Sequence, residues 1–310
     1  MVLYRKFGKL GWSVSAVGLG TWNIGNQWGP IDDTTAWATV REAFNHGVNL
    51  FDVAESYGVP NGLSEERLGT ALSGIRHRVI LISKIGHWGK RTGQGVPKTS
   101  VDMIRMCAHA SLHRLRTDWL DVELCHESDI EDPSIYLEAF EMLKQRGRIV
   151  AYGISTNSLE VLKRFNVNGT CSVVQVDYSL LNRAPEQEFL PYCQEQGIAV
   201  MVRGPLAKGV LSGNYGANTV FDDDVRSGWN KPGAQRDAYL RNINVVDKLK
   251  QKYQPGNEMV TAALRYVISH PSHPVAIPGA KSPAQAQSNA AAGAQTLTDK
   301  EIAELQAMTQ

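Results

Sequence analysis

The sequence predicts an α/β protein, a closed (β/α)8 TIM barrel, and three observations support this fold class. Eight strand-like apolar runs are separated by helical patterns, which is typical of parallel βαβ units. The runs are continuously apolar rather than alternating, as expected for strands that are buried on both faces. Eight such units in 310 residues suit the length of a barrel. We therefore expect a single domain over residues 1–310, with an N-terminal β-hairpin and extra C-terminal helices.

The individual elements follow from local patterns along the chain. Segments 2–7 and 12–16 flank Gly8-Lys9-Leu10-Gly11 and predict the hairpin. The expected barrel strands are 17–21, 50–54, 79–84, 120–125, 149–154, 172–176, 198–202 and 274–277. The first expected helix begins at a cap in residues 32–34 and ends at Gly47, and another begins at Pro133. The other expected helices lie at about 63–72, 100–115, 158–165, 185–196, 235–252, 258–269 and 283–292. Residues 204–234 are predicted to form a long loop.

An open, doubly wound sheet is the alternative to a barrel. A dinucleotide fingerprint, GxGxxG after the first strand, would favour the open sheet. This chain has Gly18-Leu19-Gly20 followed by Thr-Trp-Asn, so the fingerprint is absent. The barrel is therefore the preferred fold.

Composition argues against a nucleic-acid-binding, membrane-spanning or secreted protein and against a cysteine metal site. The formal net charge of +1 and the absence of basic runs argue against a nucleic-acid partner, and no apolar stretch reaches membrane-spanning length. The N-terminus lacks the apolar segment of a secretory signal, so a cytoplasmic protein is expected. The cysteines have no CxxC spacing and predict inert core thiols rather than a metal site; they are Cys107, Cys125, Cys171 and Cys193.

The first chemical clue is a carboxylate inside an apolar strand. Asp52 interrupts Leu-Phe-Asp-Val-Ala, and Tyr57 follows where the strand gives way to a loop. A buried carboxylate costs free energy unless it is paired with a cation or hydrogen-bonded. Asp52 is therefore expected to have a partner elsewhere in the chain.

The carboxyl ends of the predicted strands supply that partner, because a barrel builds its site at this edge. Lys84 ends the next strand, and neighbouring barrel strands place their ends side by side, so Lys84 is the expected cation for Asp52. His126 ends the fourth strand. Polar residues at further strand ends are Ser155, Thr156, Asn157, Gln175, Asp177 and Arg203.

With these residues in place, the sequence resembles the aldo-keto reductase superfamily over essentially the whole chain. The matching residues are Asp52 and Tyr57 in FDVAESYG, Lys84 in LISKIG and His126 in LDVELCHESD. The blocks YGISTNS, VVQVDYSLL, GPLAKGVLSGNY and IPGAKSPAQAQSN match in order. The segment Ile277-Pro278-Gly279-Ala280 is similar to the branch with potassium-channel β-subunit-like and bacterial sugar- or inositol-related members.

The resemblance implies an oxidoreductase that interconverts a carbonyl and an alcohol by hydride transfer from NADP(H). Protonating the alkoxide as it forms requires a general acid. A cation beside a tyrosine favours its phenolate, so Tyr57 is the expected proton donor and Lys84 its tuning cation. Asp52 is expected to hold Lys84, and His126 to orient the substrate oxygen or share the proton.

The resemblance also implies a cofactor site and a substrate pocket. The implied cofactor-binding residues are Gly20, Thr21, Trp22, Ser155, Gln175, Arg203, Gly204, Leu206, Lys208, Gly209, Gly279, Lys281, Gln285 and Asn289. Arg203 stands where the family commonly has an aromatic residue, and we expect its planar guanidinium to stack on the nicotinamide. NADP(H) is favoured, with NAD(H) or dual use as the alternative. Trp22 and Trp88 are expected in the substrate pocket, which the loops 85–99, 127–132 and 215–234 shape.

Several alternatives stay open at this stage. The substrate can be a small aldehyde, a dicarbonyl, an aldose or an inositol-derived ketone, in either reaction direction. A barrel isomerase, aldolase or lyase that uses Lys84 as a Schiff-base amine is a rival interpretation. A slow-turnover regulatory protein that keeps the fold and the cofactor is another. A homo-oligomer is compatible with the sequence.

Overall fold

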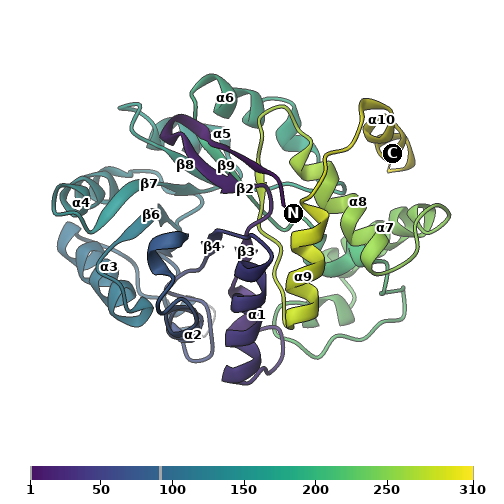
Figure 1. Cartoon of the computed structure of the whole chain (residues 1–310), viewed down its shortest axis with the longest axis horizontal. Coiled ribbons are helices and arrows are strands. Elements are labelled where there is room, and N and C mark those ends of the chain that lie inside the picture. The colour runs from purple at the N-terminus through teal and green to yellow at the C-terminus, as the bar shows by residue number, and fades with distance from the viewer. Residues whose placement is uncertain (1, 91–92, 310) are drawn as a thin grey trace.

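The computed structural model describes residues 2–90 and 93–309, and these form a barrel of parallel strands surrounded by helices (Figure 1). The strands lie in the sheet in chain order and every neighbouring pair is parallel. They are β3 (Leu19–Gly20), β4 (Leu50–Asp52), β5 (Ile80–Ile85), β6 (Leu120–Cys125), β7 (Ile149–Ser155), β8 (Val173–Asp177), β9 (Ala199–Arg203) and β10 (Val275–Ala276). The predicted fold class is confirmed.

The barrel closes between its first and last strands. Parallel bridges join Val17 to Ala276 and Gly20 to Gly279. The Gly18 amide donates to the Ala276 carbonyl at 2.8 Å, and the Ala276 amide donates to Ala16 at 3.1 Å. Because the strand edges pair with each other, the backbone groups of these short strands are satisfied.

A hairpin covers one end of the barrel, as predicted. Its strands β1 (Tyr4–Phe7) and β2 (Trp12–Ser15) are antiparallel and are joined by a short 3-10 turn. The Lys9 amide donates to the carbonyl of Gly197, which precedes β9, so the hairpin lies at the amino ends of the strands. Phe7 and Val14 pack on the interior side chains of the barrel.

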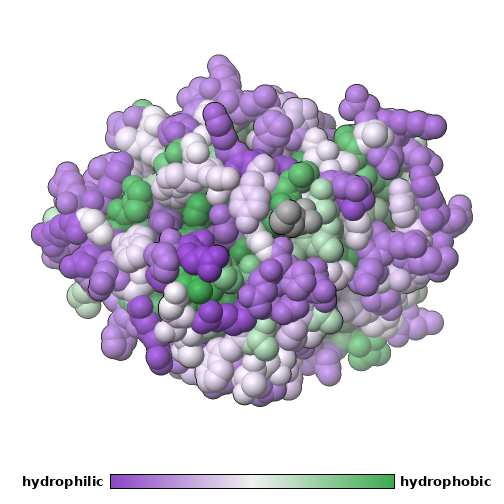
Figure 2. All heavy atoms as spheres, viewed as in Figure 1, coloured by the Kyte–Doolittle hydropathy of each residue, from purple (hydrophilic) through white to green (hydrophobic). Residues whose placement is uncertain are grey.

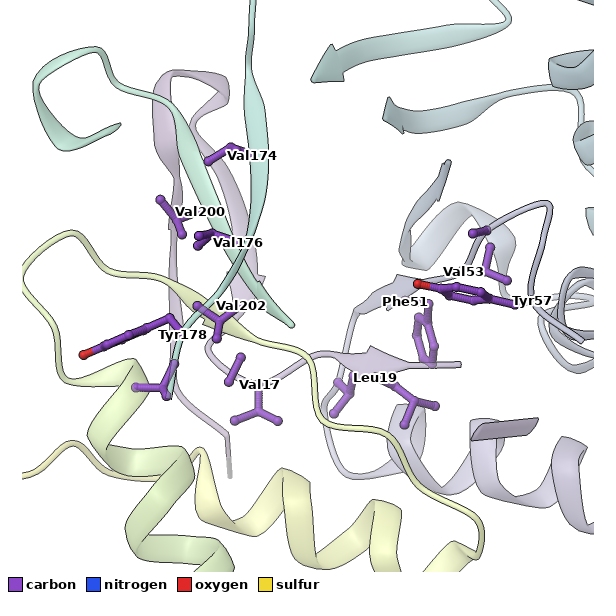
Figure 3. Close-up of a cluster of buried hydrophobic side chains, with 14 of the residues drawn as sticks. Val17, Leu19, Phe51, Val53, Tyr57, Val174, Val176, Tyr178, Val200 and Val202 are labelled. Atoms are coloured by element: carbon purple, nitrogen blue, oxygen red, sulfur yellow. The ribbon is translucent and has the colours of Figure 1, made fainter. Parts of the chain in front are cut away.

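Alternation along each strand separates two apolar layers. In β5, Ile82 belongs to the cluster inside the barrel, whereas Leu81 and Ile85 belong to the cluster between sheet and helices. Figure 3 shows part of the outer layer, in which Val176 and Val202 of neighbouring strands point toward the helices. Each inward position near a carboxyl end of a strand is consequently available for the site.

Ten α-helices are seen in the described ranges, and most surround the sheet. They are α1 (Asp33–Asn45), α2 (Leu63–Ala71), α3 (Val101–Leu115), α4 (Ser134–Gln145), α5 (Leu159–Phe165), α6 (Phe189–Glu195), α7 (Ala234–Leu249), α8 (Asn257–Ile268), α9 (Pro283–Ala292) and α10 (Asp299–Met308). Asp32 caps α1 by accepting a hydrogen bond from the Thr35 amide, as its sequence predicts. Ala36, Val40 and Ala43 of that helix are buried.

The structure differs from the sequence prediction in three elements. The helix expected at 185–196 begins as a 3-10 turn and becomes α-helical only at Phe189. The loop expected at 204–234 contains two 3-10 segments, Ala207–Ser212 and Ser227–Asn230. Helix α10 buries only Leu305, so it lacked the apolar stripe that predicts a helix, although a capping box from Thr298 to Glu301 starts it.

The surface is mostly hydrophilic on the face shown in Figure 2, where hydrophobic residues show in small separate groups. None of the helices in the described ranges combines the length and the apolar character that crossing a bilayer requires.

Candidate active site

The buried carboxylate and the buried cation lie together at the carboxyl ends of β4 and β5. Asp52 ends β4, and its register partner in β5 is Ile82, two residues before Lys84. The ammonium of Lys84 lies 2.8 Å from Oδ2 and 2.7 Å from Oδ1 of Asp52. The Lys84 side chain has no exposed surface, and Asp52 is 2% exposed. Lys84 is therefore the partner that the sequence led us to expect for Asp52.

Further contacts fix this pair. Lys84 also donates to the Val53 carbonyl at 2.7 Å, and the amide of Gln175 on β8 donates to Asp52 Oδ1 at 2.8 Å. Burial by itself lowers the pKa of Lys84, but the Asp52 carboxylate and the Tyr57 phenol outweigh burial and hold that pKa above its usual value. Lys84 is consequently a permanent cation at neutral pH.

Tyr57 meets this cation directly. Its hydroxyl lies 3.2 Å from the Lys84 ammonium, and its side chain is 6% exposed. Figure 3 shows the Tyr57 ring beside Val53, at the edge of the apolar layer. Trp22 stacks on the ring at 5.7 Å between centroids, and the indole of Trp22 donates to Gln27 at 2.5 Å. The phenol is thus held between an apolar wall and a fixed positive charge.

Two histidines complete this end of the barrel. His126 follows β6, is 7% exposed, and its ring meets Tyr57 edge-on with centroids 6.0 Å apart. His87 follows β5 and stacks on His126 at 4.0 Å with 16° between the planes. Sequence reasoning missed His87, although it follows Gly86 immediately after a strand end, where site residues gather.

A cavity of about 770 Å³ opens over these residues, a size that small-molecule and cofactor sites commonly have. Tyr57, Asp52 and His126 line it, and Lys84 lies directly behind them. Predicted cofactor residues that line the cavity are Gly20, Trp22, Ser155, Gln175, Arg203, Gly204, Leu206, Lys208, Gly209, Gly279, Lys281, Gln285 and Asn289. Residues from both halves of the sequence thus line the same cavity.

Two predicted site residues lie elsewhere in the structure. Thr21 is fully buried, and its hydroxyl donates to the Asp52 carbonyl at 2.8 Å, so it supports the strand end without facing the cavity. Trp88 packs under the guanidinium of Arg114 at 5.1 Å, on the helix side of the sheet. Within the described residues, His87 lines the cavity in place of Trp88, because adjacent residues of the loop point in different directions. Arg91 and Thr92 of that loop lie outside the described residues.

Arg203, at the end of β9, is held at the cavity by its neighbours. Its guanidinium donates to Asn157 Oδ1 at 2.9 Å and lies 4.0 Å from the Asp177 carboxylate. Of the two residues after Ser155, Thr156 donates instead to the Ser128 carbonyl at 2.6 Å, and Asn157 is occupied by Arg203. A flat cation at this position suits a planar or an anionic group.

The far end of the cavity is lined by glycines, lysines and the start of a helix. Gly204, Lys208 and Gly209 have positive φ angles of 66°, 56° and 92°, which bring backbone close to the cavity. Burial lowers the pKa of Lys208 from its ordinary value. Helix α9 begins at this edge, and its N-cap Ser282 accepts from the Gln285 amide.

Arg226, which lies in a loop expected to shape the substrate pocket, and Trp28, which the sequence did not assign to the site, both line the cavity. The guanidinium of Arg226 lies 5.4 Å from the Trp28 ring, and the Lys281 ammonium donates to the Trp28 carbonyl at 2.6 Å. Arg226 is itself held by Asp223 at 2.8 Å. Segment 215–230 therefore contacts the loop that follows β3 across the mouth of the cavity.

The ranges 2–90 and 93–309 contain no group of three or more histidine, cysteine or acidic side chains arranged to hold a metal ion. The four cysteines are free, and all but Cys107 are buried.

Comparison with known proteins agrees with this geometry. A family model described as "Aldo/keto reductase family" matches residues 16–310. An NADH-specific methylglyoxal reductase of Escherichia coli (strain K12) is 31% identical over 322 residues, which cover 96% of this chain and 95% of that protein.

Solved structures are similar over the whole chain. The holo form of aldo-keto reductase AKR11C1 from Bacillus halodurans has a TM-score of 0.81 and 29% identity, with 100% of this chain and 97% of that chain covered. An aldo/keto reductase from Klebsiella pneumoniae in complex with NADP and acetate has a TM-score of 0.74 and 29% identity, with 100% and 96% covered.

Proposed function

Because this chain belongs to the aldo/keto reductase family and is an oxidoreductase, we propose that it interconverts a small aldehyde, ketone or aldose and the corresponding alcohol with NADP(H). One observation carries the proposal: the Tyr57 hydroxyl lies 3.2 Å from the buried ammonium of Lys84, at the wall of the cavity. This arrangement suits proton transfer to or from a substrate oxygen.

Each residue of the group has a separate task in the proposed proton transfer. Tyr57 gives its proton to the substrate oxygen as the carbonyl is reduced, and takes it back in the oxidative direction. The charge of Lys84 stabilises the phenolate that remains. Asp52 holds Lys84 in place and is itself held by Gln175, and His126, whose ring lies next to that of Tyr57, orients the substrate oxygen.

The cavity fits a nicotinamide dinucleotide, which supplies the hydride when bound. Ser155, Gln175 and Arg203 would hold the nicotinamide end, since all three line the cavity beside Asp52 and Tyr57. The backbone of Gly204 to Gly209 would hold the pyrophosphate, and Lys281 with the start of α9 the adenosine end. We propose that Arg203 stacks on the nicotinamide; a crystal structure with bound cofactor in which Arg203 points away would contradict this.

NADP(H) is the proposed preference. The Lys281 ammonium and the positive end of the α9 dipole supply positive charge for a 2′-phosphate. The similar Klebsiella pneumoniae structure contains NADP, whereas the Escherichia coli relative is NADH-specific, so the ratio of kcat/KM for NADPH and NADH is the deciding measurement. Lys281→Met is expected to lower this ratio; an unchanged ratio would place the selectivity elsewhere.

A Schiff-base function for Lys84 is disfavoured by its surroundings. A Schiff base requires a neutral amine with access to substrate. Lys84 has no exposed surface and its pKa is raised, mainly by Asp52 against the opposing effect of burial. Borohydride is expected to trap no adduct in the presence of a carbonyl substrate.

We further propose that residues 1–310 act as one domain, because the lining of the cavity is drawn from β3 through α9. The test of the function is a panel of aldehydes, dicarbonyls, aldoses and polyols, assayed by nicotinamide absorbance with both cofactors. Turnover of at least one carbonyl is expected. A purified, folded protein that binds NADPH and turns over no member of the panel in either direction would support the regulatory alternative.

A further inference from the structure

Hydrogen bonds and ion pairs hold the loop after β5 in a position where the His87 ring stacks on His126. Gly86 has a φ of 148°, and its amide donates to the buried carboxylate of Glu55 at 2.9 Å. A Cβ added to Gly86 would lie 3.1 Å from the His126 carbonyl carbon and 3.1 Å from Glu127 Oε1. The backbone therefore passes against the end of β6 at a separation that suits glycine.

Two more contacts hold this loop in place. Glu55 is 1% exposed, and it also forms an ion pair with Lys98 at 3.2 Å. Lys90 forms a further ion pair with Glu127, the residue after His126. The loop is thus tied to the strand ends on both sides of His87.

The result is a pair of parallel imidazoles in the wall of the cavity. The rings of His87 and His126 are 4.0 Å apart at their centroids and 16° from parallel, and both residues line the cavity. His126 in turn meets Tyr57 edge-on at 6.0 Å. His126 therefore lies between His87 and Tyr57, the proposed proton donor.

This spacing suits a substrate with two adjacent oxygens. Each imidazole has two ring nitrogens that can donate or accept a hydrogen bond. Trp22 and Trp28 form an apolar wall of the same cavity and are in edge-to-face contact at 5.1 Å. An apolar carbon chain suits the tryptophans, whereas oxygens on neighbouring carbons suit the two histidines.

We propose that His87 binds the oxygen next to the reacting carbonyl, so that 1,2-dicarbonyls and 2-hydroxycarbonyls are the preferred substrates. This inference rests on the function proposed above, in which His126 faces the reacting oxygen. His87 is then a residue that determines substrate specificity, placed by Gly86 and Glu55.

The test compares substrates that differ in this oxygen alone. Methylglyoxal and lactaldehyde carry an oxygen on the second carbon, and propanal does not. His87→Phe keeps a ring against His126 but removes the nitrogens. We expect it to lower kcat/KM about tenfold for methylglyoxal and lactaldehyde, the size of one hydrogen bond, and to leave propanal nearly unchanged. His87→Gln, which keeps a donor and an acceptor, is expected to restore part of the loss.

Controls separate specificity from damage to the fold. His109 is an exposed histidine on α3, and His109→Phe is expected to leave kcat/KM unchanged for all three substrates. The NADPH dissociation constant and the unfolding midpoint of each variant show whether the site is intact. An equal fall for all three aldehydes, or no fall for any, would overturn the role of His87. Failure of the wild-type protein to reduce any aldehyde would instead overturn the proposed function.

Discussion

Two buried polar clusters lie on opposite faces of the same strands. The inner cluster faces the cavity and consists of Asp52, Tyr57, Lys84, His126 and Gln175. The outer cluster lies between the sheet and helices α2 and α3 and consists of Glu65, Ser83, Ser111, Arg114 and Glu123. Ser83 and Lys84 are adjacent in β5, so the alternation of the strand alone sends them to different clusters.

The clusters differ in how their charges are satisfied. In the outer one, Glu65 accepts from Ser83 at 2.7 Å and from Arg114 at 2.6 Å. Glu123 has no exposed surface, and neither of its carboxyl oxygens has a hydrogen-bond partner within the described part of the chain. Burial, with Glu65 and Glu55 nearby, raises the pKa of Glu123 well above its ordinary value.

The difference shows that a buried charge does not by itself mark a site of chemistry. Both clusters contain ionic groups in strands or helices that pack on the sheet. The inner cluster places a fixed cation next to a phenol that lines a cavity. The residues of the outer cluster are not among those that line this cavity. Access, rather than charge, separates the proposed active site from a structural ion pair.

The largest predicted contrast comes from removing the cation of each cluster. Lys84→Met and Arg114→Met each leave a buried carboxylate, and each is expected to destabilise the protein by about 3–5 kcal/mol. Lys84→Met is expected to lower kcat by a further ~10²–10⁴-fold, because it removes the charge beside Tyr57. Arg114→Met is expected to leave kcat per folded molecule unchanged.

Urea unfolding and steady-state kinetics on the two variants measure these effects. A comparable loss of kcat in folded Arg114→Met would show that the outer cluster also serves the chemistry. Retained kcat in Lys84→Met would remove the inner cluster from the mechanism.

A smaller contrast is expected in the pH dependence of stability. The folded protein holds the Glu123 proton to a higher pH than the unfolded chain, which releases it near its ordinary pKa of ~4.3. The free energy of unfolding therefore falls as pH rises above that value, by up to about 1.4 kcal/mol per pH unit, until the raised pKa is reached. Glu123→Gln removes this contribution, so its stability should fall less steeply with rising pH than that of the wild type.

Chemical denaturation at a series of pH values tests this, with Glu138→Gln on the exposed face of α4 as the control. Plotted against pH, the free energies of unfolding of the wild type and of Glu123→Gln are expected to converge in acid and to separate toward neutral pH. Glu138→Gln is expected to follow the wild type. Parallel curves for wild type and Glu123→Gln would mean that Glu123 is ionised in the folded protein.

The smallest effect concerns Trp88, which the structure places with the outer cluster. Trp88→Leu removes the ring under Arg114 and is expected to cost about 0.5–2 kcal/mol of stability. Because Trp88 does not line the cavity among the described residues, the KM for carbonyl substrates is expected to stay unchanged. A marked rise in KM with unchanged stability would return Trp88 to the substrate pocket.

Much of the inner cluster could be predicted from sequence because it follows a rule of the fold. Polar residues after apolar strands meet at one edge of a parallel barrel, so Asp52 and Lys84 could be paired before their distance was known. The same rule gave the general place of His126. The hairpin followed from the turn residues between its two segments, and the parallel strand order followed from the alternation of strand and helix patterns along the chain.

The remaining features depend on side-chain direction and loop path, which periodicity does not contain. His87 and Trp88 are neighbours, and which of them enters the cavity depends on the backbone at Gly86. Glu123, like Asp52, is a carboxylate in an apolar strand. It lies on the outer face of the sheet, however, and within the described residues its carboxyl oxygens have no hydrogen-bond partner. No residue range was assigned to helix α10, because its apolar face is too small to show a period.

The central claim, that Tyr57 exchanges the proton under the charge of Lys84, is tested most directly by single-turnover reduction with Tyr57→Phe. The control is Tyr136→Phe, since Tyr136 is also buried but lies on α4 outside the barrel. We predict that Tyr57→Phe binds NADPH normally and reduces substrate about 10²–10⁴-fold more slowly, while Tyr136→Phe keeps the wild-type rate. A Tyr57→Phe variant that reduces substrate at the wild-type rate would contradict the proposed mechanism.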